Sequence, residues 1–134
     1  MNIAKIMIPK VMTAFLHDKN TVRQGLEVMT RYGYTAVPVL DDEDCYLGCV
    51  TEGDFLRHVM AVGSTQKHDH EHYRIGEIFR RDFCPAVDID APEEQVISAI
   101  LNQNFLPVVD GQGKLCGIVT RKSVISYLWE KTNR

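Results

Sequence analysis

Four consecutive residues in the first half of the chain have the types and spacing to bind an anion or a sugar. They are Thr51, Glu52, Gly53 and Asp54, and they follow an apolar run. A threonine that ends a strand can offer its hydroxyl to a phosphate or to a free amide of the next helical turn. The start of that helix attracts anions, and the aspartate can accept hydrogen bonds from two ribose hydroxyls. The alternative is a capping box between Thr51 and Asp54, with no ligand.

A second stretch, "GIVTRKS" at 117–123, repeats part of this pattern. Thr120 stands where Thr51 stood, but Ser123 replaces the aspartate, so the sugar contact has no counterpart here. Arg121 and Lys122 instead place two cationic donors at the start of a predicted helix. They either bind an anion or form a solvated surface pair.

These two stretches belong to an internal repeat. "PVLDDEDCYLGCVT" (38–51) aligns without a gap with "PVVDGQGKLCGIVT" (107–120), and "IAKIM" (3–7) aligns with "IGEIF" (75–79). The second copy is shorter, with the loss near Tyr34. We therefore predict a first repeat at 1–63, a polar, histidine-containing linker at 64–73 and a second repeat at 74–134.

Each repeat has the pattern of a β-α-β-β-α unit. Apolar residues recur at helical spacing in "VRQGLEVM" and "EGDFLRHVMAV", whereas "YTAVPVL" and "YLGCVT" are short and β-rich. Gly48 is expected where a side chain would crowd a close backbone approach. One repeat exposes an apolar sheet face. We expect an α/β fold, more narrowly α+β, in which two repeats pack with pseudo-twofold symmetry, sheets inside and helices outside.

Composition limits the function classes. The 134 residues are 45% hydrophobic and 25% charged with a net charge of −3, which is typical of a globular protein. No basic run indicates a nucleic-acid partner, and no apolar run is long enough to span a membrane. The four cysteines lack zinc-site spacing. We therefore expect the cysteines to be free thiols in a reducing compartment, and the protein to be cytoplasmic.

The tandem of a helix, "hPVhD", a turn and "GhhTxxD" (h, apolar; x, any residue) resembles a pair of CBS domains, the Bateman module. The resemblance covers nearly the whole chain and implies a homodimeric regulatory module without catalysis or a required cofactor. It implies binding of AMP, ADP, ATP or S-adenosylmethionine and control of an unidentified partner protein. "GYTAVPVLD" and "TRK" also resemble the stand-alone bacterial CBS proteins that bind cyclic di-AMP and dock on metabolic enzymes.

The resemblance also implies which residues contact the nucleotide. Thr51 and Asp54 would meet its ribose and phosphate, and Thr120, Arg121 and Lys122 would form a cationic half-site. The base would meet the backbone of the opposite wall, formed by Tyr34, Thr35, Ala36 and the stretch 12–15 with Ala14. The Tyr34 ring either stacks on the base or is a half-buried strand aromatic.

The choice of nucleotide stays open on these residues. Asp54 suits the free diol of AMP, ADP or ATP, whereas a cyclic 3′,5′-linked dinucleotide keeps only its 2′ hydroxyl. The cations at 121 and 122 suit a ligand with two phosphates. We expect Asp54 to lie near the surface, so that Asp54→Ala would weaken mononucleotide binding and leave the fold intact.

Other readings of the chain are a ligand-free scaffold, a metal site and an enzyme. His68, His70 and His72 alternate in "KHDHEHY" and would share one face of a strand, but the segment is better read as a polar linker. No nucleophile elbow, P-loop or zincin motif is present, and Cys84 has no histidine partner that the sequence identifies. We therefore predict no catalytic residue and no metal site. A constitutive dimerisation scaffold remains the alternative to a nucleotide sensor.

Overall fold

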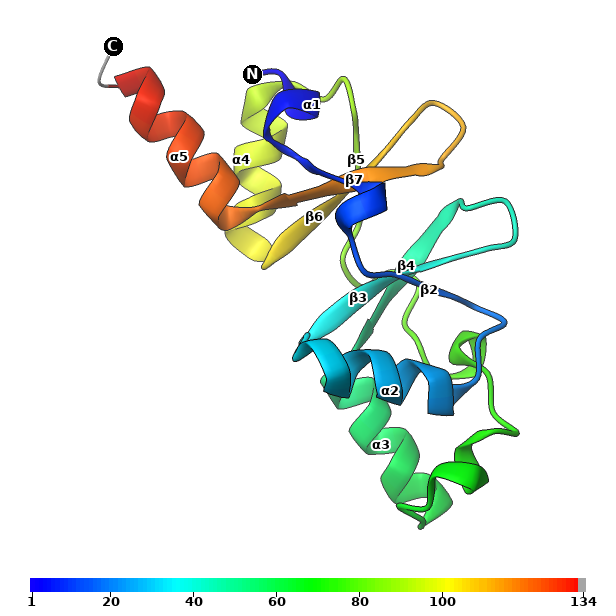
Figure 1. The fold of residues 1–134 in the computed structure, drawn as a ribbon. Coiled ribbons are helices and arrows are strands. Elements are labelled where there is room, and N and C mark those ends of the chain that lie inside the picture. Colours follow the sequence, from blue (N-terminus) through cyan, green and yellow to red (C-terminus); the bar gives the residue numbers. More distant parts are fainter. Residues whose placement is uncertain (133–134) are drawn as a thin grey trace. The chain divides into compact units, whose positions relative to one another are not determined.

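The computed structural model describes residues 1–132 and divides the chain into two compact units (Figure 1). We call residues 14–83 the central unit, and residues 1–13 with those from 84 onward the terminal unit. The elements in chain order are α1 (Ile3–Ile6), β1 (Ile8–Pro9), η1 (Lys10–Met12), β2 (Leu16–His17), α2 (Val22–Tyr32), β3 (Ala36–Leu40), β4 (Tyr46–Thr51), α3 (Glu52–Val62), η2 (Lys67–His70), η3 (Ile75–Glu77), β5 (Val87–Asp88), α4 (Glu93–Asn102), β6 (Phe105–Val109), β7 (Leu115–Thr120) and α5 (Arg121–Thr132). The order β-α-β-β-α occurs twice, so the predicted α+β class is confirmed.

The central unit is built on a sheet of order β2-β3-β4, with β2 parallel and β4 antiparallel to β3. Helix α2 begins at a capping box between Thr21 and Gln24, and α3 ends at Gly63, which has the left-handed conformation (φ 76°). Apolar residues of both helices and all three strands form one core. Its buried members are Leu16, Val22, Met29, Val37, Val39, Val50, Phe55, Ile75 and Phe79.

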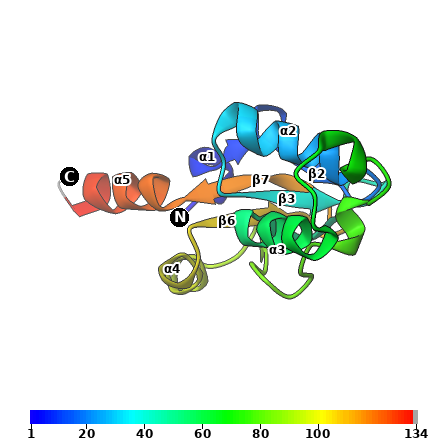
Figure 2. The same cartoon turned by 90° about the horizontal axis from the view of Figure 1, so that it is seen from below.

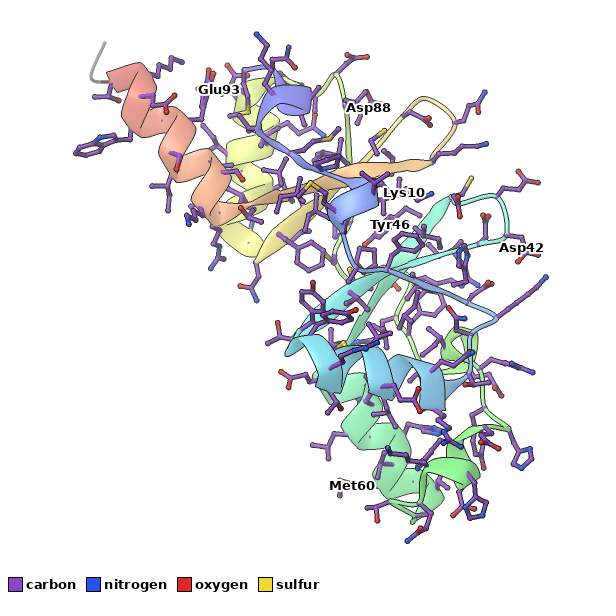
Figure 3. All side chains as sticks on the ribbon, viewed as in Figure 1. Lys10, Asp42, Tyr46, Met60, Asp88 and Glu93 are labelled. Carbon is purple, nitrogen blue, oxygen red and sulfur yellow. The ribbon has the colours of Figure 1, made fainter. Side chains whose placement is uncertain are left out.

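The terminal unit has a sheet of order β1-β7-β6-β5. Its two long helices are linked through Glu93 at the start of α4, where Figure 3 labels this side chain. The Glu93 carboxylate accepts hydrogen bonds from the Tyr127 hydroxyl and the Lys131 ammonium of α5, both at 3.1 Å. Helix α5 continues beyond the sheet in both ribbon views (Figures 1 and 2) and leaves Ile125 and Trp129 exposed.

The two sequence repeats exchange their leading segments. Strand β1 of the first repeat pairs with β7 of the second, where Pro9 lies opposite Gly117. In the second repeat, Arg80 forms the corresponding bridge to Cys49 of β4. In each case the leading segment passes over a glycine of the strand. A Cβ atom on Gly117 would clash with the carbonyl oxygen of Ile8, and a Cβ atom on Gly48 would lie 2.7 Å from the carbonyl oxygen of Arg80. The close approach predicted at Gly48 is therefore confirmed, and the compact units divide the chain differently from the repeats.

The repeated aspartate after each proline-containing strand shapes the hairpin turn. The Asp41 Oδ1 accepts hydrogen bonds from the amides of Glu43 and Cys45 at 2.8 and 2.9 Å. The Asp110 Oδ1 makes the corresponding bonds to residues 112 and 114 at 2.8 and 3.0 Å. Side-chain bonds of this kind replace backbone bonds in a tight turn. This aspartate in "PVLD" and "PVVD" therefore has a structural role.

Candidate functional site

The junction of β4 and α3 in the central unit holds the residues that the sequence singled out first. Thr51 ends the strand and caps the helix, and its Oγ1 accepts a hydrogen bond from the Asp54 amide at 3.2 Å. The Asp54 Oδ2 in turn accepts bonds from the Thr51 amide and hydroxyl at 2.9 and 3.0 Å. The capping box, stated above as the alternative to a ligand contact, is therefore present.

Asp54 is buried, with 4% of its surface exposed, so the expectation that it lies near the surface is wrong. Its Oδ1 accepts a hydrogen bond from Arg57 Nη2 at 2.6 Å and another from Arg80 Nε at 3.1 Å. A buried carboxylate is tolerated because it is paired and hydrogen-bonded. Asp54 thus joins three segments: the end of β4, the first turns of α3 and the crossing segment at Arg80.

Arg80 is the residue at this junction that the sequence reading missed. Its backbone bridges to Cys49 beside Gly48, and its guanidinium carbon lies 4.0 Å from the centre of the Phe83 ring. The signal available in the sequence was Gly48, because a glycine at a close approach implies a second chain segment. The glycine alone does not indicate which segment of the chain passes over it.

The opposite wall predicted for the base lies beside the same junction. Ala36 of β3 pairs with Thr51 of β4, and the Thr35 carbonyl oxygen accepts a hydrogen bond from the Glu52 amide at 3.0 Å. Tyr34 is exposed, and it lines a pocket of about 350 Å³ with Phe55 and other residues of the two helices. The remaining lining residues are Leu26, Met29, Thr30, Gly33 and Glu52.

Ala14 belongs to the same unit and precedes strand β2. It is half-buried and packs against the core cluster that includes Leu16 and Val37. Six of the predicted residues, at positions 14, 34, 35, 36, 51 and 54, therefore lie in the central unit. The other three lie in the terminal unit.

In the terminal unit the junction of β7 and α5 is built differently. The Thr120 Oγ1 accepts the Ser123 amide at 3.1 Å and contacts the Ser123 hydroxyl at 2.9 Å. Arg121 donates from Nε to the Ile100 carbonyl at 3.1 Å and from Nη2 to the Leu101 carbonyl at 3.4 Å. These carbonyls are in the last turn of α4, so Arg121 satisfies helix-end acceptors. Lys122 is exposed on the first turn of α5.

The histidine segment is not a strand, so its three imidazoles do not share one strand face. It contains the short helix η2, and His70 is 1% exposed. The His70 Nε2 contacts the Ser64 carbonyl at 2.8 Å, and its ring lies 5.2 Å from that of His58 on α3. Burial lowers the pKa of His58, and His70 lowers it further, against the opposing charge of Glu77. Among residues 1–132, no three His, Cys, Asp or Glu side chains are grouped to hold a metal ion.

Comparison with known proteins identifies the family. Residues 3–61 and 75–130 each match the CBS domain. The chain belongs to the CBS domain family. No helix within residues 1–132 has the length and apolar character to cross a membrane.

Relatives of known name differ in how much of their length this chain spans. Cyclic di-AMP receptor B of Bacillus subtilis is 24% identical over 126 residues, which cover 94% of this chain and 85% of the receptor. Inosine-5'-monophosphate dehydrogenase of Methanocaldococcus jannaschii is 26% identical over 122 residues, but the match covers only 22% of that enzyme. The similarity to the dehydrogenase is therefore confined to a part of it.

A solved structure has the same fold. The crystal structure of CbpB in complex with c-di-AMP has a TM-score of 0.87 at 22% identity, and the match covers 97% of this chain and 85% of that chain. The tandem CBS pair inferred from the sequence repeat is confirmed.

Proposed function

We propose that this chain is a regulatory module that binds an adenine nucleotide and alters its contact with a partner protein. The observation that carries the proposal is the β4–α3 junction. A capped helix start and two guanidinium groups lie together there, and the exposed Tyr34 lines a pocket with Glu52 and Phe55 of the same helix. These groups suit a phosphate and a base. We propose no catalytic role.

Cyclic di-AMP is the first nucleotide to test. The ribose diol of a mononucleotide would need a free Asp54 carboxylate, but this carboxylate already accepts four hydrogen bonds. The receptor from Bacillus subtilis, whose name states that ligand, matches over most of both chains. AMP, ADP and ATP remain the other candidates. The proposed contacts are Thr51, Asp54, Tyr34, Thr35, Ala36 and Ala14 in the central unit and Thr120, Arg121 and Lys122 in the terminal unit. A ligand hydroxyl would reach Asp54 by displacing one of its four present donors.

We also propose that the module is a cytoplasmic homodimer. Several large apolar side chains on its helices are exposed, among them Leu56 and Met60 of α3, Leu101 of α4, and Ile125 and Trp129 of α5. Figure 3 shows Met60 projecting from the far end of α3, and 72% of its surface is exposed. Contact with a second copy would bury such side chains. Sedimentation equilibrium would test this, and a monomer at micromolar concentration would contradict it.

The second candidate function is a scaffold that holds its partner with no ligand. The complete hydrogen bonding of Asp54 favours it, because Thr51 and Asp54 then serve only to cap α3. A thermal-shift screen with AMP, ATP and cyclic di-AMP separates the two functions. Suppose that a ligand binds only the folded state. At a concentration of 100 times its Kd, it adds about 2.7 kcal/mol to the free energy of unfolding. A rise in Tm with one of the three supports the sensor, and no rise with any supports the scaffold.

A further inference from the structure

Two histidine rings fasten the segment that follows α3. His70 of η2 is 1% exposed, and its ring lies edge-on against the His58 ring of α3, with 5.2 Å between the ring centres. The Tyr73 ring also lies edge-on against His58, at 4.6 Å. The His70 Nε2 contacts the Ser64 carbonyl oxygen at 2.8 Å. We call residues 64–72 the strap, because this pair of histidines holds them against α3.

The site suits neutral imidazoles and disfavours cationic ones. A carbonyl oxygen can only accept a hydrogen bond, so we assign the proton of neutral His70 to Nε2. The Nδ1 of His70 and the Nε2 of His58 are buried without a hydrogen-bond partner among residues 1–132. In a cationic imidazole both nitrogens are donors, so each of these atoms would be a buried N–H without an acceptor. Such a group costs free energy, and two cationic rings at this distance also repel each other.

One acidic residue opposes this effect. Burial lowers the pKa of His58, and the neighbouring His70 lowers it further, whereas the charge of Glu77 on η3 raises it. The Glu77 carboxylate also accepts a hydrogen bond from the Arg74 amide at 2.6 Å. The net change is a lower pKa for His58, so Glu77 does not compensate for burial.

The acidic residues of the strap have partners of their own. Asp69 pairs with His68 at 3.0 Å and accepts a hydrogen bond from the Ser64 hydroxyl. Glu71 is ion-paired with Arg23 of α2, and both of these side chains are more than a third exposed. An exposed ion pair of this kind contributes little to stability. The buried histidine contact is therefore the main attachment of the strap.

The chain is fixed on both sides of the strap. Helix α3 ends at Gly63 in the left-handed conformation. Beyond the strap, the Tyr73 carbonyl oxygen accepts a hydrogen bond from the Val22 amide at 2.8 Å. The Ile75 amide donates to the Asn20 carbonyl oxygen at the same distance. Backbone bonds of 3.1 and 3.3 Å join residues of the strap to one another, so the strap can open locally while the core stays folded.

The strap forms one wall of a cavity of about 510 Å³ beside α2. Thr65 and Lys67 line the cavity from the strap. The lining residues from α2 are Arg23, Leu26, Glu27, Thr30 and Arg31. Opening of the strap would remove this wall, so the closed and open states present different surfaces. A difference of this kind is what a regulatory device needs.

We propose that the strap is a pH-sensitive latch, which is closed while the His58 and His70 rings are neutral and opens when His58 takes up a proton at mildly acidic pH. In the open state the His58 ring is exposed to water, so the open state binds a proton at a higher pH than the closed state does. Acid therefore shifts the equilibrium toward the open strap, below the pKa of an exposed histidine, about 6.5. The inference uses no nucleotide contact, so its test is independent of the proposed function.

Hydrogen exchange followed by mass spectrometry tests the latch on the full chain. Exchange is measured at about pH 7.5 and about pH 5.5, because an exposed histidine changes from mostly neutral to mostly cationic over this range. After correction for the intrinsic exchange rate at each pH, the protection of peptides within 64–72 should fall about tenfold. This is the effect of one proton that only the open state binds. The strap should also exchange much faster than β3 and β4 at both pH values, because it opens without global unfolding.

Three variants identify the group that titrates. His58→Phe keeps a ring but cannot take up a proton, and His58→Gln removes the ring. Both should abolish the fall in protection, whatever their protection at the higher pH. His68→Gln is the matched control, because the His68 side chain is in the same segment and is 71% exposed, and it should keep the fall.

Three results would overturn the inference. The first is equal protection of the wild-type strap at the two pH values, and the second is the same fall in the two His58 variants as in the wild type. The third is a strap that is as well protected as β3 and β4, since it would then open only on global unfolding.

Discussion

Replacing Asp54 by alanine should destabilise the central unit, contrary to what the sequence alone suggested. The substitution removes two hydrogen bonds from Thr51, at 2.9 and 3.0 Å, each with a net value of about 1 kcal/mol. It also removes ion pairs with Arg57 and Arg80, worth about 0.5 kcal/mol or less each because both arginines are more than a third exposed. The free energy of unfolding should fall by about 2 to 3 kcal/mol, or roughly 10 °C in Tm.

Ser123→Ala is the matched control, since Ser123 follows Thr120 as Asp54 follows Thr51. It loses only the 2.9 Å contact with the Thr120 hydroxyl, because the backbone bond to Thr120 remains. We expect a cost of about 0.5 to 1 kcal/mol. Urea unfolding of both variants, followed by circular dichroism at pH 7, gives the comparison. If Asp54→Ala costs no more than Ser123→Ala, Asp54 is not a structural residue, and its carboxylate is again available to a ligand.

Three further predictions concern packing, pH and helix ends. Gly117→Ala should destabilise the terminal unit by about 1 to 3 kcal/mol in urea unfolding, because the Cβ would clash with β1, whereas Gly111→Ala, in open space, should cost less than about 0.5 kcal/mol. Burial lowers the pKa of His58, so His58 binds a proton at a higher pH in the unfolded chain than in the folded chain. The free energy of unfolding should therefore fall as the pH drops below about 6.5, and a slope unchanged in His58→Gln would disprove this origin. Arg121→Ala should lower Tm through the freed carbonyls of α4, and Lys122→Ala should not; equal effects would contradict the capping role.

The order of the elements was accessible from the sequence because each depends on local patterns. Apolar residues at helical spacing predicted α2 and α3. The proline-apolar-aspartate pattern predicted strands β3 and β6 and the turns that follow them. Residues close in sequence determine these features, so one chain is enough to identify them.

The exchange of leading segments could not be predicted from such patterns. Pairing of β1 with β7 joins residues at opposite ends of the chain, and no local spacing encodes it. The same holds for Arg80, which reaches Asp54 only because its segment crosses β4 at Gly48. The sequence therefore singled out Asp54 but predicted the wrong burial for it. It also did not reveal that the Arg121 side chain donates a hydrogen bond to the last turn of α4.

The histidine segment is polar in composition but partly buried in the structure. "KHDHEHY" is polar, which favours a solvated linker, yet His70 is buried and packs edge-on against His58. The neighbouring Glu71 is ion-paired with Arg23 of α2, so this segment is attached to the helices of the central unit. Long-range packing of a polar segment of this kind depends on partners that are distant in sequence.

The most direct test of nucleotide sensing is a calorimetric titration of the purified chain with cyclic di-AMP, with AMP and ATP titrated at the same salt concentration. We predict saturable binding of cyclic di-AMP with a Kd on the order of 1 μM or lower, tighter than for either mononucleotide. Tighter binding of AMP or ATP than of cyclic di-AMP would still support nucleotide sensing, with a mononucleotide as the ligand. No saturable binding of any of the three would contradict nucleotide sensing, and would leave Thr51 and Asp54 as the cap of a helix in a scaffold.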